Sequence, residues 1–558
     1  MFYGFTWTDE GLYLSQVHRL FTGDRLLIDD WTPTQFYAPL LYPLYSLFVK
    51  INGSTDGAFL FFRLITITLQ FFTSVFAYFV FSQKNAKLPS LFASLLPLIF
   101  ARACLNGPSY YTLGQISYFL GILCIYAVFS LNYNCFILIF SGIFFATAVL
   151  CNPFLIIPYI IISITVLIIK NTRKEIGKIF LIWAGSILCG IIYCIFVFSG
   201  STVNDILTGL HYTYNDPSYK HSIILTIKRL YKMPKLLVFP YIITWLPLII
   251  TCVIFEIKKI EKTTENKFIL QIINLALFTI NCFYEHDCGS AIMPFLHFTI
   301  FSAYIFFDGD IKTFIISVKK EFLYFVLPGM ILAYFFCFAS DTGFGVCSIG
   351  MTIAAIGEIF IYHKIIQKKE KTPYLLNWLK SLPLIILFAF TLFYRTNNIY
   401  RDSPLPAHIL FVPNFSKNTA KIESGPAKGL YTSIGNKKHY DNLYSLLSEI
   451  EEETQKSIFI SGTATWAYIA RPNILCSAPT TWRTFFDDAR LQSYYENFPK
   501  KDLPDYILIL NSDNPSNDGR YEKKNDYENI KETWLYTKLI KSDYIKKEYP
   551  SGILYLKN

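Results

Sequence analysis

The run AFLFFRLITITLQFFTSVFAYFVFS (residues 58–82) decides the fold of this 558-residue chain. It contains one charged side chain, Arg63. A helix of roughly 20 apolar residues crosses the hydrocarbon core of a bilayer, and this run is long enough to do so. Similar apolar runs recur as far as residue 395. The sequence therefore predicts a membrane protein with many helical crossings.

The overall composition points the same way. Hydrophobic residues make up 53% of the chain and charged residues 16%, whereas a soluble domain carries about 25% charged residues. The mean hydropathy is +0.37. The formal charge of +10 is spread over short spacers and forms no basic domain, so positive loops on the cytoplasmic side explain it better than nucleic-acid binding.

About twelve apolar runs are candidates for transmembrane helices. They cover residues 58–82, 88–106, 113–131, 135–150, 154–170, 178–199, 236–256, 267–283, 290–307, 321–339, 347–364 and 379–395.

Positive charge alternates from one loop to the next, which predicts the orientation of the spans. Loops rich in Lys and Arg face the cytoplasm, and here they contain Lys84 and Lys87; Lys170, Arg173, Lys174 and Lys178; Lys258, Lys259, Lys262 and Lys267; Lys312, Lys319 and Lys320; and Lys364, Lys368, Lys369 and Lys371. The loops between them then face outward, near residues 107–112, 200–235, 285–290 and 341–345.

The chain divides into three predicted regions. Residues 1–57 form an external segment, residues 58–395 form the transmembrane region, and residues 396–558 form an external α/β domain. SIFISGTATWAYIA (residues 457–470) and DYILILN (505–511) are β-rich, whereas HYDNLYSLLSEIEEE (439–453) has helical spacing. The predicted fold is thus a polytopic α-helical membrane protein with a small α/β domain at its C-terminal end.

Residues 1–57 do not show the pattern of a signal peptide, so we expect them to be an external segment. Its stretch YAPLLYPLYSLFVKI (residues 37–51) alternates Pro with apolar and aromatic residues, which favours short helices lying in the membrane interface. An external start with no crossing before it indicates either that a first helix is missing or that another signal exports this end.

An acidic pair, Asp9 and Glu10, is the most informative feature of this segment, and Asp24, Asp29 and Asp30 follow it. Glycosyl transfer to a hydroxyl needs a carboxylate within hydrogen-bond reach of the acceptor proton. The pair could provide that carboxylate. Alternatively, it is simply an acidic start to the helix GLYLSQVHRLF, which the helix dipole favours.

The external acidic pair, the short helix, the acidic patch, the Pro/Tyr-rich stretch and Arg63 together resemble the polyprenol-linked GT-C glycosyltransferases. The pattern is most similar to the branch of the protein O-mannosyltransferases and aminoarabinose transferases. In that family the aspartate of the first external loop is the proposed catalytic base. The resemblance thus implies that Asp9 is the base and that Glu10 orients the acceptor or the sugar.

The oligosaccharyltransferase branch of the same superfamily needs acidic metal ligands in its second external loop and a W-W-D motif. LNGPSYYTLGQ (residues 105–115) contains no carboxylate, and hard divalent ions require several oxygen ligands. We therefore expect transfer without a metal or any other cofactor.

A lipid-phosphate leaving group requires positive charge near the outer surface. Arg102 is one candidate, because an intramembrane Arg usually faces a polar cavity or partner. Lys228, Arg229, Lys232 and Lys235 form a second basic group. Attraction to anionic headgroups explains this second group equally well.

Further candidates lie in other predicted external loops. Glu285, His286 and Asp287 could bind the sugar or assist the acceptor, or could form a solvated turn. Tyr110 could stack on a sugar or could belong to the interfacial aromatic belt. Cys288 and Cys347 could pair or remain thiols. Asp9, Arg102, the basic group, Glu285 and Asp341 all fall on the same predicted face.

The sequence therefore predicts a membrane glycosyltransferase. It would transfer a sugar from a polyprenyl-phosphate donor, with inversion, to a hydroxyl of a glycan, lipid or protein acceptor at the extracytoplasmic face. We expect a bacterial inner membrane location. The alternatives are a transporter or flippase, which would carry polar residues in mid-span, and a polymerase of lipid-linked sugars, which would favour a large central external loop.

Overall fold

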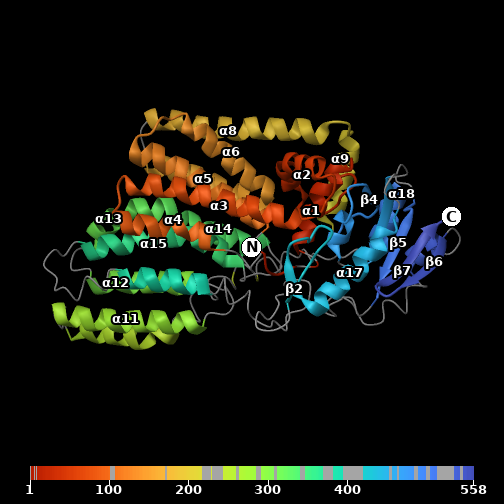
Figure 1. Cartoon of the computed structure of the whole chain (residues 1–558). Coiled ribbons are helices and arrows are strands. Elements are labelled where there is room, and N and C mark those ends of the chain that lie inside the picture. Colours follow the sequence, from red (N-terminus) through yellow and green to blue (C-terminus); the bar gives the residue numbers. More distant parts are fainter. Residues whose placement is uncertain are drawn as a thin grey trace.

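The computed structural model describes most of the chain (Figure 1). The described residues are 2–5, 7, 9–100, 107–169, 173–215, 228, 231, 243–258, 263–284, 291–306, 311–339, 346–367, 381–393, 419–450, 455–461, 464–482, 488–497, 503–511, 533–540 and 544–558.

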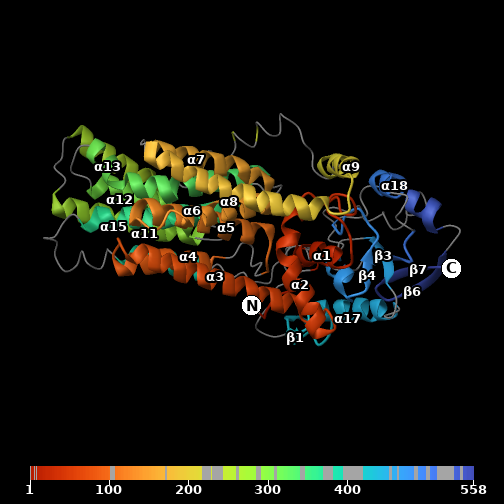
Figure 2. The ribbon, with the colours of Figure 1, turned by 90° about the horizontal axis from the view of Figure 1, so that it is seen from above.

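Apolar helices form an elongated bundle, and a mixed sheet lies beyond one end of it (Figures 1 and 2). The helices of the bundle are α3 (Ala58–Ser82), α4 (Lys87–Ile99), α5 (Tyr110–Leu131), α6 (Ile137–Cys151), α7 (Ile156–Ile169), α8 (Arg173–Phe198), α11 (Thr264–Tyr284), α12 (Ile292–Phe306), α13 (Ile311–Glu321), α14 (Leu327–Ala339) and α15 (Cys347–Gln367). A π-helical turn, η4 (Phe322–Val326), joins α13 to α14, and two more apolar helices cover Ile243–Ile257 and Ser381–Phe393.

Each predicted span overlaps an apolar helix, and parts of some spans, such as residues 101–106 and 236–242, lie outside the described residues. Among the described residues, six helices are long and apolar enough to cross a membrane, and six more are shorter apolar helices of 10–17 residues. These apolar helices therefore make the molecule a membrane protein. The number of crossings, about twelve, stays a prediction.

The helices of the bundle differ in what they face. In the 18-residue apolar windows within Tyr110–Leu131 and Cys347–Ile366, 89% of the residues are buried, whereas in the window within Gly177–Phe198 the share is 17%. The exposed side of α8 is apolar, with Phe180, Ile187 and Ile195 uncovered. An apolar surface of this kind is stable against lipid tails, so α5 and α15 form the centre of the bundle and α8 its lipid-facing edge.

The N-terminal segment lies at the end of the bundle nearest the sheet. Its elements are α1 (Asp9–Phe21), the 3₁₀ turn η1 (Gln35–Tyr37) and α2 (Ala38–Asn52). The sequence favoured several short helices over residues 37–51. The structure instead has one continuous helix, α2, with Pro43 inside it. Leu44, Leu47 and Ile51 are exposed on one side of α2, which suits the predicted place in the membrane interface.

The C-terminal region is a small α/β domain, as the sequence predicts. Its strands are β1 (Thr419–Lys421), β2 (Tyr431–Ser433), β3 (Lys456–Ser461), β4 (Ile474–Cys476), β5 (Tyr506–Leu510), β6 (Tyr544–Tyr549) and β7 (Gly552–Lys557), and its helices include α17 (Ile434–Ser448) and α18 (Asp488–Asn497). The larger sheet has the order β4-β3-β5-β7-β6. Strand β3 is parallel to β4 and β5, whereas β7 is antiparallel to β5 and β6.

One hydrophobic core joins the N-terminal segment to this domain. Phe5, Trp7 and Leu14 are fully buried in the same cluster as Tyr440 and Trp466. Helix α1 lies against the edge of the sheet that contains β3 and β4 (Figure 2). The segment and the domain thus fold as one unit. The predicted boundaries at residues 57 and 395 stay predictions, and residues 394–418 lie outside the described part of the chain.

Candidate functional site

The acidic pair begins helix α1. Asp9 is its first residue, and Asp9 and Glu10 are the acidic residues of its first turn. Carboxylates are favourable there because the free N–H groups and the helix dipole stabilise negative charge. The two side chains have different surroundings: Asp9 is partly exposed, whereas Glu10 is 2% exposed.

Glu10 forms a buried ion pair with Arg63 of α3. Arg63 Nε donates to Oε1 at 2.6 Å, and Nη2 donates to Oε2 at 2.6 Å. Arg63 Nη2 also donates to the Gly4 carbonyl at 2.8 Å. A bidentate pair of this kind fixes geometry as well as charge. Glu10 and Arg63 therefore fasten the first turn of α1 to the start of the first long apolar helix.

The second predicted external loop packs against the same turn. A Cβ on Gly107 would lie 3.0 Å from Oε1 of Glu10. Two residues later, the Ser109 hydroxyl accepts a hydrogen bond from the Thr112 amide at 3.0 Å and caps α5. The absence of a side chain at Gly107 thus lets this loop approach Glu10.

Tyr110, the first residue of α5, faces the same helix. Its ring centroid lies 5.7 Å from that of Tyr13. Tyr13 is four residues after Asp9 and hence on the same side of α1. Tyr111 continues this aromatic group toward the bundle, where its ring lies 5.6 Å from Phe336. Of the predicted site residues, Asp9 and Glu10 thus lie in the first turn of α1, and Tyr110 contacts Tyr13 one turn further along.

The later acids of the N-terminal segment hold α1 in place. Arg19 is 1% exposed, and its guanidinium lies 2.7 Å from Asp24 and 3.8 Å from Asp30. It also donates to the Ala478 carbonyl at 2.9 Å. Burial raises the pKa of Asp30, and the Arg19 charge opposes only part of that effect. This acidic patch belongs to the interface with the C-terminal domain.

His18 makes a second link between α1 and the sheet. Its Nε2 lies 2.9 Å from the Ile474 carbonyl, and its Nδ1 lies 2.8 Å from the Tyr45 hydroxyl. A carbonyl only accepts, so Nε2 carries the proton and Nδ1 of the neutral ring accepts from Tyr45. Burial lowers the pKa of His18 to about 4. The ring is therefore neutral at pH 7.

Gly11 brings the sheet domain up to the turn that carries Asp9. A Cβ at Gly11 would lie 2.5 Å from Thr465 Oγ1 and 2.6 Å from the Trp466 amide nitrogen. Both belong to the turn η6 (Thr465–Ile469), which follows β3. Only glycine permits this approach. Sequence reasoning missed Gly11, His18 and Arg19, because nothing in a short amphipathic helix marks which polar residues are buried.

Several predicted site residues lie outside the described part of the chain. Lys228 is described, and it is exposed. The predicted residues outside the described part are Arg102, Arg229, Lys232, Glu285, His286 and Asp287, together with Lys235, Asp341 and Cys288. Their predicted roles in binding the donor phosphate or the sugar stay predictions.

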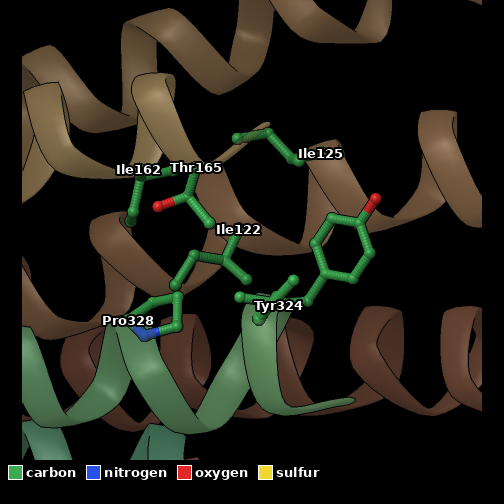
Figure 3. A pocket seen from close by; sticks show the side chains of 7 residues that line it. Ile122, Ile125, Ile162, Thr165, Tyr324 and Pro328 are labelled. Atoms are coloured by element: carbon green, nitrogen blue, oxygen red, sulfur yellow. The ribbon is translucent and has the colours of Figure 1, made fainter. Parts of the chain in front are cut away.

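Two further observations bear on the chemistry. Among the described residues, no three His, Cys, Asp or Glu side chains gather so that they could hold a metal ion. A small pocket lies inside the bundle between α5, α7, η4 and α14 (Figure 3), and its lining is mainly apolar. Ile122, which lines it, is twelve residues along α5 from Tyr110, or roughly 18 Å. The pocket is thus separate from the acidic pair.

Comparisons with known proteins found matches among solved structures alone. No protein-family model matches this chain, and no curated protein sequence matches it. A crystal structure of the Archaeoglobus fulgidus oligosaccharyltransferase, tethered with an acceptor peptide, has a TM-score of 0.46 and 12% identity, covering 100% of this chain and 71% of that one. ArnT from Cupriavidus metallidurans has a TM-score of 0.43 and 9% identity, covering 99% and 94%.

A third solved structure is the archaeal oligosaccharyltransferase AglB from A. fulgidus in complex with an inhibitory peptide and a dolichol-phosphate. Its TM-score is 0.46 at 11% identity, and the match covers 99% of this chain and 70% of that one. TM-scores below 0.5 at 9–12% identity carry no argument about the function of this chain. Identities this low transfer no residue role, so the functional argument rests on the residues around Asp9.

Proposed function

We propose that this protein is an inverting membrane glycosyltransferase of the GT-C type, with Asp9 as its catalytic base. The donor is a sugar linked to polyprenyl phosphate, and the acceptor is a hydroxyl of a glycan, lipid or protein at the extracytoplasmic face. The observation that supports this most directly is the pair itself. Asp9 is partly exposed on a helix whose next residue, Glu10, is immobilised by Arg63.

The proposed reaction requires a base for the acceptor hydroxyl and positive charge at the leaving phosphate. The Asp9 carboxylate takes the proton of the acceptor hydroxyl, and the oxygen attacks the anomeric carbon from the side opposite the phosphate. The bond between that carbon and the phosphate oxygen breaks, and the polyprenyl phosphate leaves with the bonding electrons. The configuration at the anomeric carbon is thereby inverted. Arg102, Lys228, Arg229 and Lys232 are the proposed phosphate ligands, and no metal is required.

The surroundings of Asp9 support separate roles for the other predicted residues. Both Glu10 oxygens accept from Arg63, so the role proposed for Glu10 is to fix the backbone that carries Asp9, in place of the predicted role of orienting the acceptor or the sugar. Tyr110 offers an aromatic surface one helical turn away, beside Tyr13, and it is the proposed stacking partner of a sugar ring. Glu285, His286 and Asp287 are proposed to complete the sugar or acceptor site.

One observation favours the transporter alternative. Glu358 lies within α15, is 1% exposed, and both of its carboxylate oxygens lack a hydrogen-bond partner among the described residues. A buried ionisable group inside a membrane span is typical of ion or substrate pathways. A flippase for lipid-linked sugars would use such a group, whereas the proposed transferase would not need it.

Reconstitution into liposomes separates the two functions. Purified wild type, Asp9→Asn and Glu358→Gln are each given polyprenyl-phosphate sugars, and both sugar transfer and movement of the carrier across the bilayer are measured. The transferase requires transfer by wild type and by Glu358→Gln, and loss of transfer by Asp9→Asn. Carrier movement without transfer, lost in Glu358→Gln, would establish the transporter instead. Asp441→Asn, which alters a partly exposed carboxylate on α17 that pairs with Lys437, is the matched control.

A further inference from the structure

Helix α9 (Val203–Tyr214) follows directly after α8, the lipid-facing helix of the bundle. The chain turns at Gly200, which has a positive φ of 75°, and Thr202 then begins α9 with a reciprocal capping box to Asp205. Helix α9 runs across the direction of α8, beside the end of α8 that is nearest the sheet (Figures 1 and 2). The first residues of α9 therefore lie close to the point where α8 ends.

The length of α8 locates that point relative to the bilayer. Residues 179–198 contain no charged side chain, whereas Lys178 precedes them. At 1.5 Å per residue, this uncharged part of α8 is about 30 Å long, which equals the thickness of the hydrocarbon core. Near its end, Ile195 is 68% exposed and Phe198 is 46% exposed. The apolar surface of α8 thus continues to the end of the helix, so α9 begins at the boundary of the membrane.

One face of α9 is buried against the N-terminal segment. Ile206 is 5% exposed and shares a small hydrophobic cluster with Leu27 and Ile28. Gly209, on the same face, packs so closely on the Leu27 carbonyl that no Cβ would fit. Val197 of α8 packs against this cluster as well. Helix α9 is thus held in the corner between α8 and the N-terminal segment.

Contacts near the end of α9 hold the helix in the same orientation. The rings of Trp31 and Tyr212 stack with centroids 4.3 Å apart. Nη2 of Arg490, in α18, donates to the Trp31 carbonyl at 2.8 Å and to the Tyr212 carbonyl at 3.4 Å. Thr213 is fully buried. The rotation of α9 about its own axis is therefore fixed, and with it the direction of its other faces.

The second face of α9 is apolar and exposed. Val203 is 64% exposed, Leu207 is 59% exposed and Tyr214 is 47% exposed. Residues four and seven positions apart lie on one side of a helix, so these three side chains form a single stripe, the α9 apolar stripe. Removal of such a stripe from water is favourable. An apolar phase is therefore expected to cover it.

The third face of α9 is polar. Asn204, Thr208 and His211 are spaced by four and by three residues and share one side of the helix. Asn204 and His211 are exposed. Helix α9 contains no Lys or Arg, and Asp205 is its one acidic residue. A helix with a protein-facing side, an apolar side and a polar side suits a position at the membrane surface, between protein, lipid and water.

We propose that the α9 apolar stripe docks on the lipid bilayer, at the level where acyl chains meet headgroups in the leaflet nearest the sheet. The occupant is lipid because the stripe begins where the exposed apolar surface of α8 ends. Tyr214 suits this level, since tyrosine is enriched at membrane interfaces. Because α9 has no basic residue, burial of apolar surface drives the contact and anionic lipid is not required. The docked helix holds the N-terminal segment at a fixed height above the bilayer.

Photo-cross-linking around α9 tests this contact in the full-length protein. The photoreactive residue p-benzoylphenylalanine replaces Val203 or Leu207 in the apolar stripe, and Asn204 or Thr208 on the polar face as matched controls. Ile195 of α8 is the positive control because it faces lipid. Each variant is reconstituted into phosphatidylcholine vesicles, with and without phosphatidylglycerol, and irradiated. Mass spectrometry then measures the fraction of each labelled peptide that carries a lipid adduct.

We expect about tenfold more lipid adduct at positions 203 and 207 than at 204 and 208, because only the first two face the acyl chains. The yield at 203 and 207 should approach that at 195, and phosphatidylglycerol should leave it unchanged. Thermal unfolding in detergent checks that each variant folds. If the variant at 207 does not fold, the variant at 203 tests the same stripe.

Three results would overturn the proposal. Equal adduct at all four positions of α9 would mean that the helix has no lipid-facing side. Cross-links from 203 or 207 to another segment of the chain or to a second copy, in place of lipid, would mean that protein covers the stripe. Adduct that appears only with phosphatidylglycerol would mean that charge drives the contact. None of these results depends on sugar transfer, so the proposed function stands or fails separately.

Discussion

Two groups of carboxylates in the same N-terminal segment have different environments. Asp9 is partly exposed at the start of α1, and its neighbour Glu10 is paired with Arg63 of the bundle. Asp24 and Asp30 instead contact the buried Arg19, which reaches the C-terminal domain. The first group lies toward the membrane helices and the second toward the sheet. Acidic residues close in sequence therefore have different surroundings, and we propose catalysis for the first group and domain docking for the second.

Among the acidic residues of this segment, we expect the substitution of Asp9 to have the largest effect on sugar transfer. Asp9→Asn should lower kcat for sugar transfer by about 10²–10⁴-fold, because an amide cannot take the acceptor proton. The melting temperature should stay within a few degrees of wild type, since Asp9 is partly exposed. Steady-state kinetics and thermal unfolding in detergent measure the two. A normal kcat would remove Asp9 as the base.

Glu10 should matter for stability more than for proton transfer. Arg63→Met leaves the buried Glu10 charge without its partner, and breaking a buried ion pair costs about 3–5 kcal/mol. Urea unfolding followed by tryptophan fluorescence would report this loss. The double variant Glu10→Leu with Arg63→Met should recover most of it, because an apolar pair requires no buried charge. If the double variant recovered no stability, the ion pair would contribute to stability through its geometry alone.

The docking of α1 on the sheet should weaken in acid. The pKa of His18 is lowered to about 4 by burial, whereas a histidine of the unfolded chain takes up its proton near pH 6.5. Below pH 6.5 the unfolded state thus binds more protons, and stability falls as the pH drops toward 4, by up to about 3 kcal/mol. Unfolding measured at several pH values tests this. His18→Gln should flatten the profile between those two values.

The smallest effect is expected at Asp30. Its pKa is raised because burial outweighs the attraction of Arg19. The ionised side chain therefore costs free energy at pH 7, and stability attributable to it rises as the pH falls. Asp30→Asn keeps an acceptor for Thr32 and removes the buried charge, so stability should stay within about 1 kcal/mol of wild type. A loss as large as that of Arg63→Met would contradict the distinction between the two acidic groups.

Part of the site was predictable from local pattern. The acidic pair was predicted to lie just ahead of the helix GLYLSQVHRLF, and the helix begins two residues earlier, at Asp9, so that the pair forms its first turn. The approach of Gly107 to Glu10 and of Tyr110 to Tyr13 was not predictable as contacts, although both loops were expected on one face. Which polar residue of α1 is buried depends on a partner more than 400 residues away, as for His18 and Ile474.

The sequence by itself predicted the apolar helices, helix α1 to within two residues of its start, and the strands β3 and β5, although residues 465–469 of the predicted β-rich run form the turn η6. Each of these depends on the length or period of an apolar run, which is a local property of the chain. The tertiary structure alone decided that Glu10 is bound by Arg63, that Arg19 and His18 reach the sheet, and that Arg490 joins α9 to Trp31. Those contacts satisfy buried polar groups between distant segments, and a buried group can be recognised only when its surroundings are known.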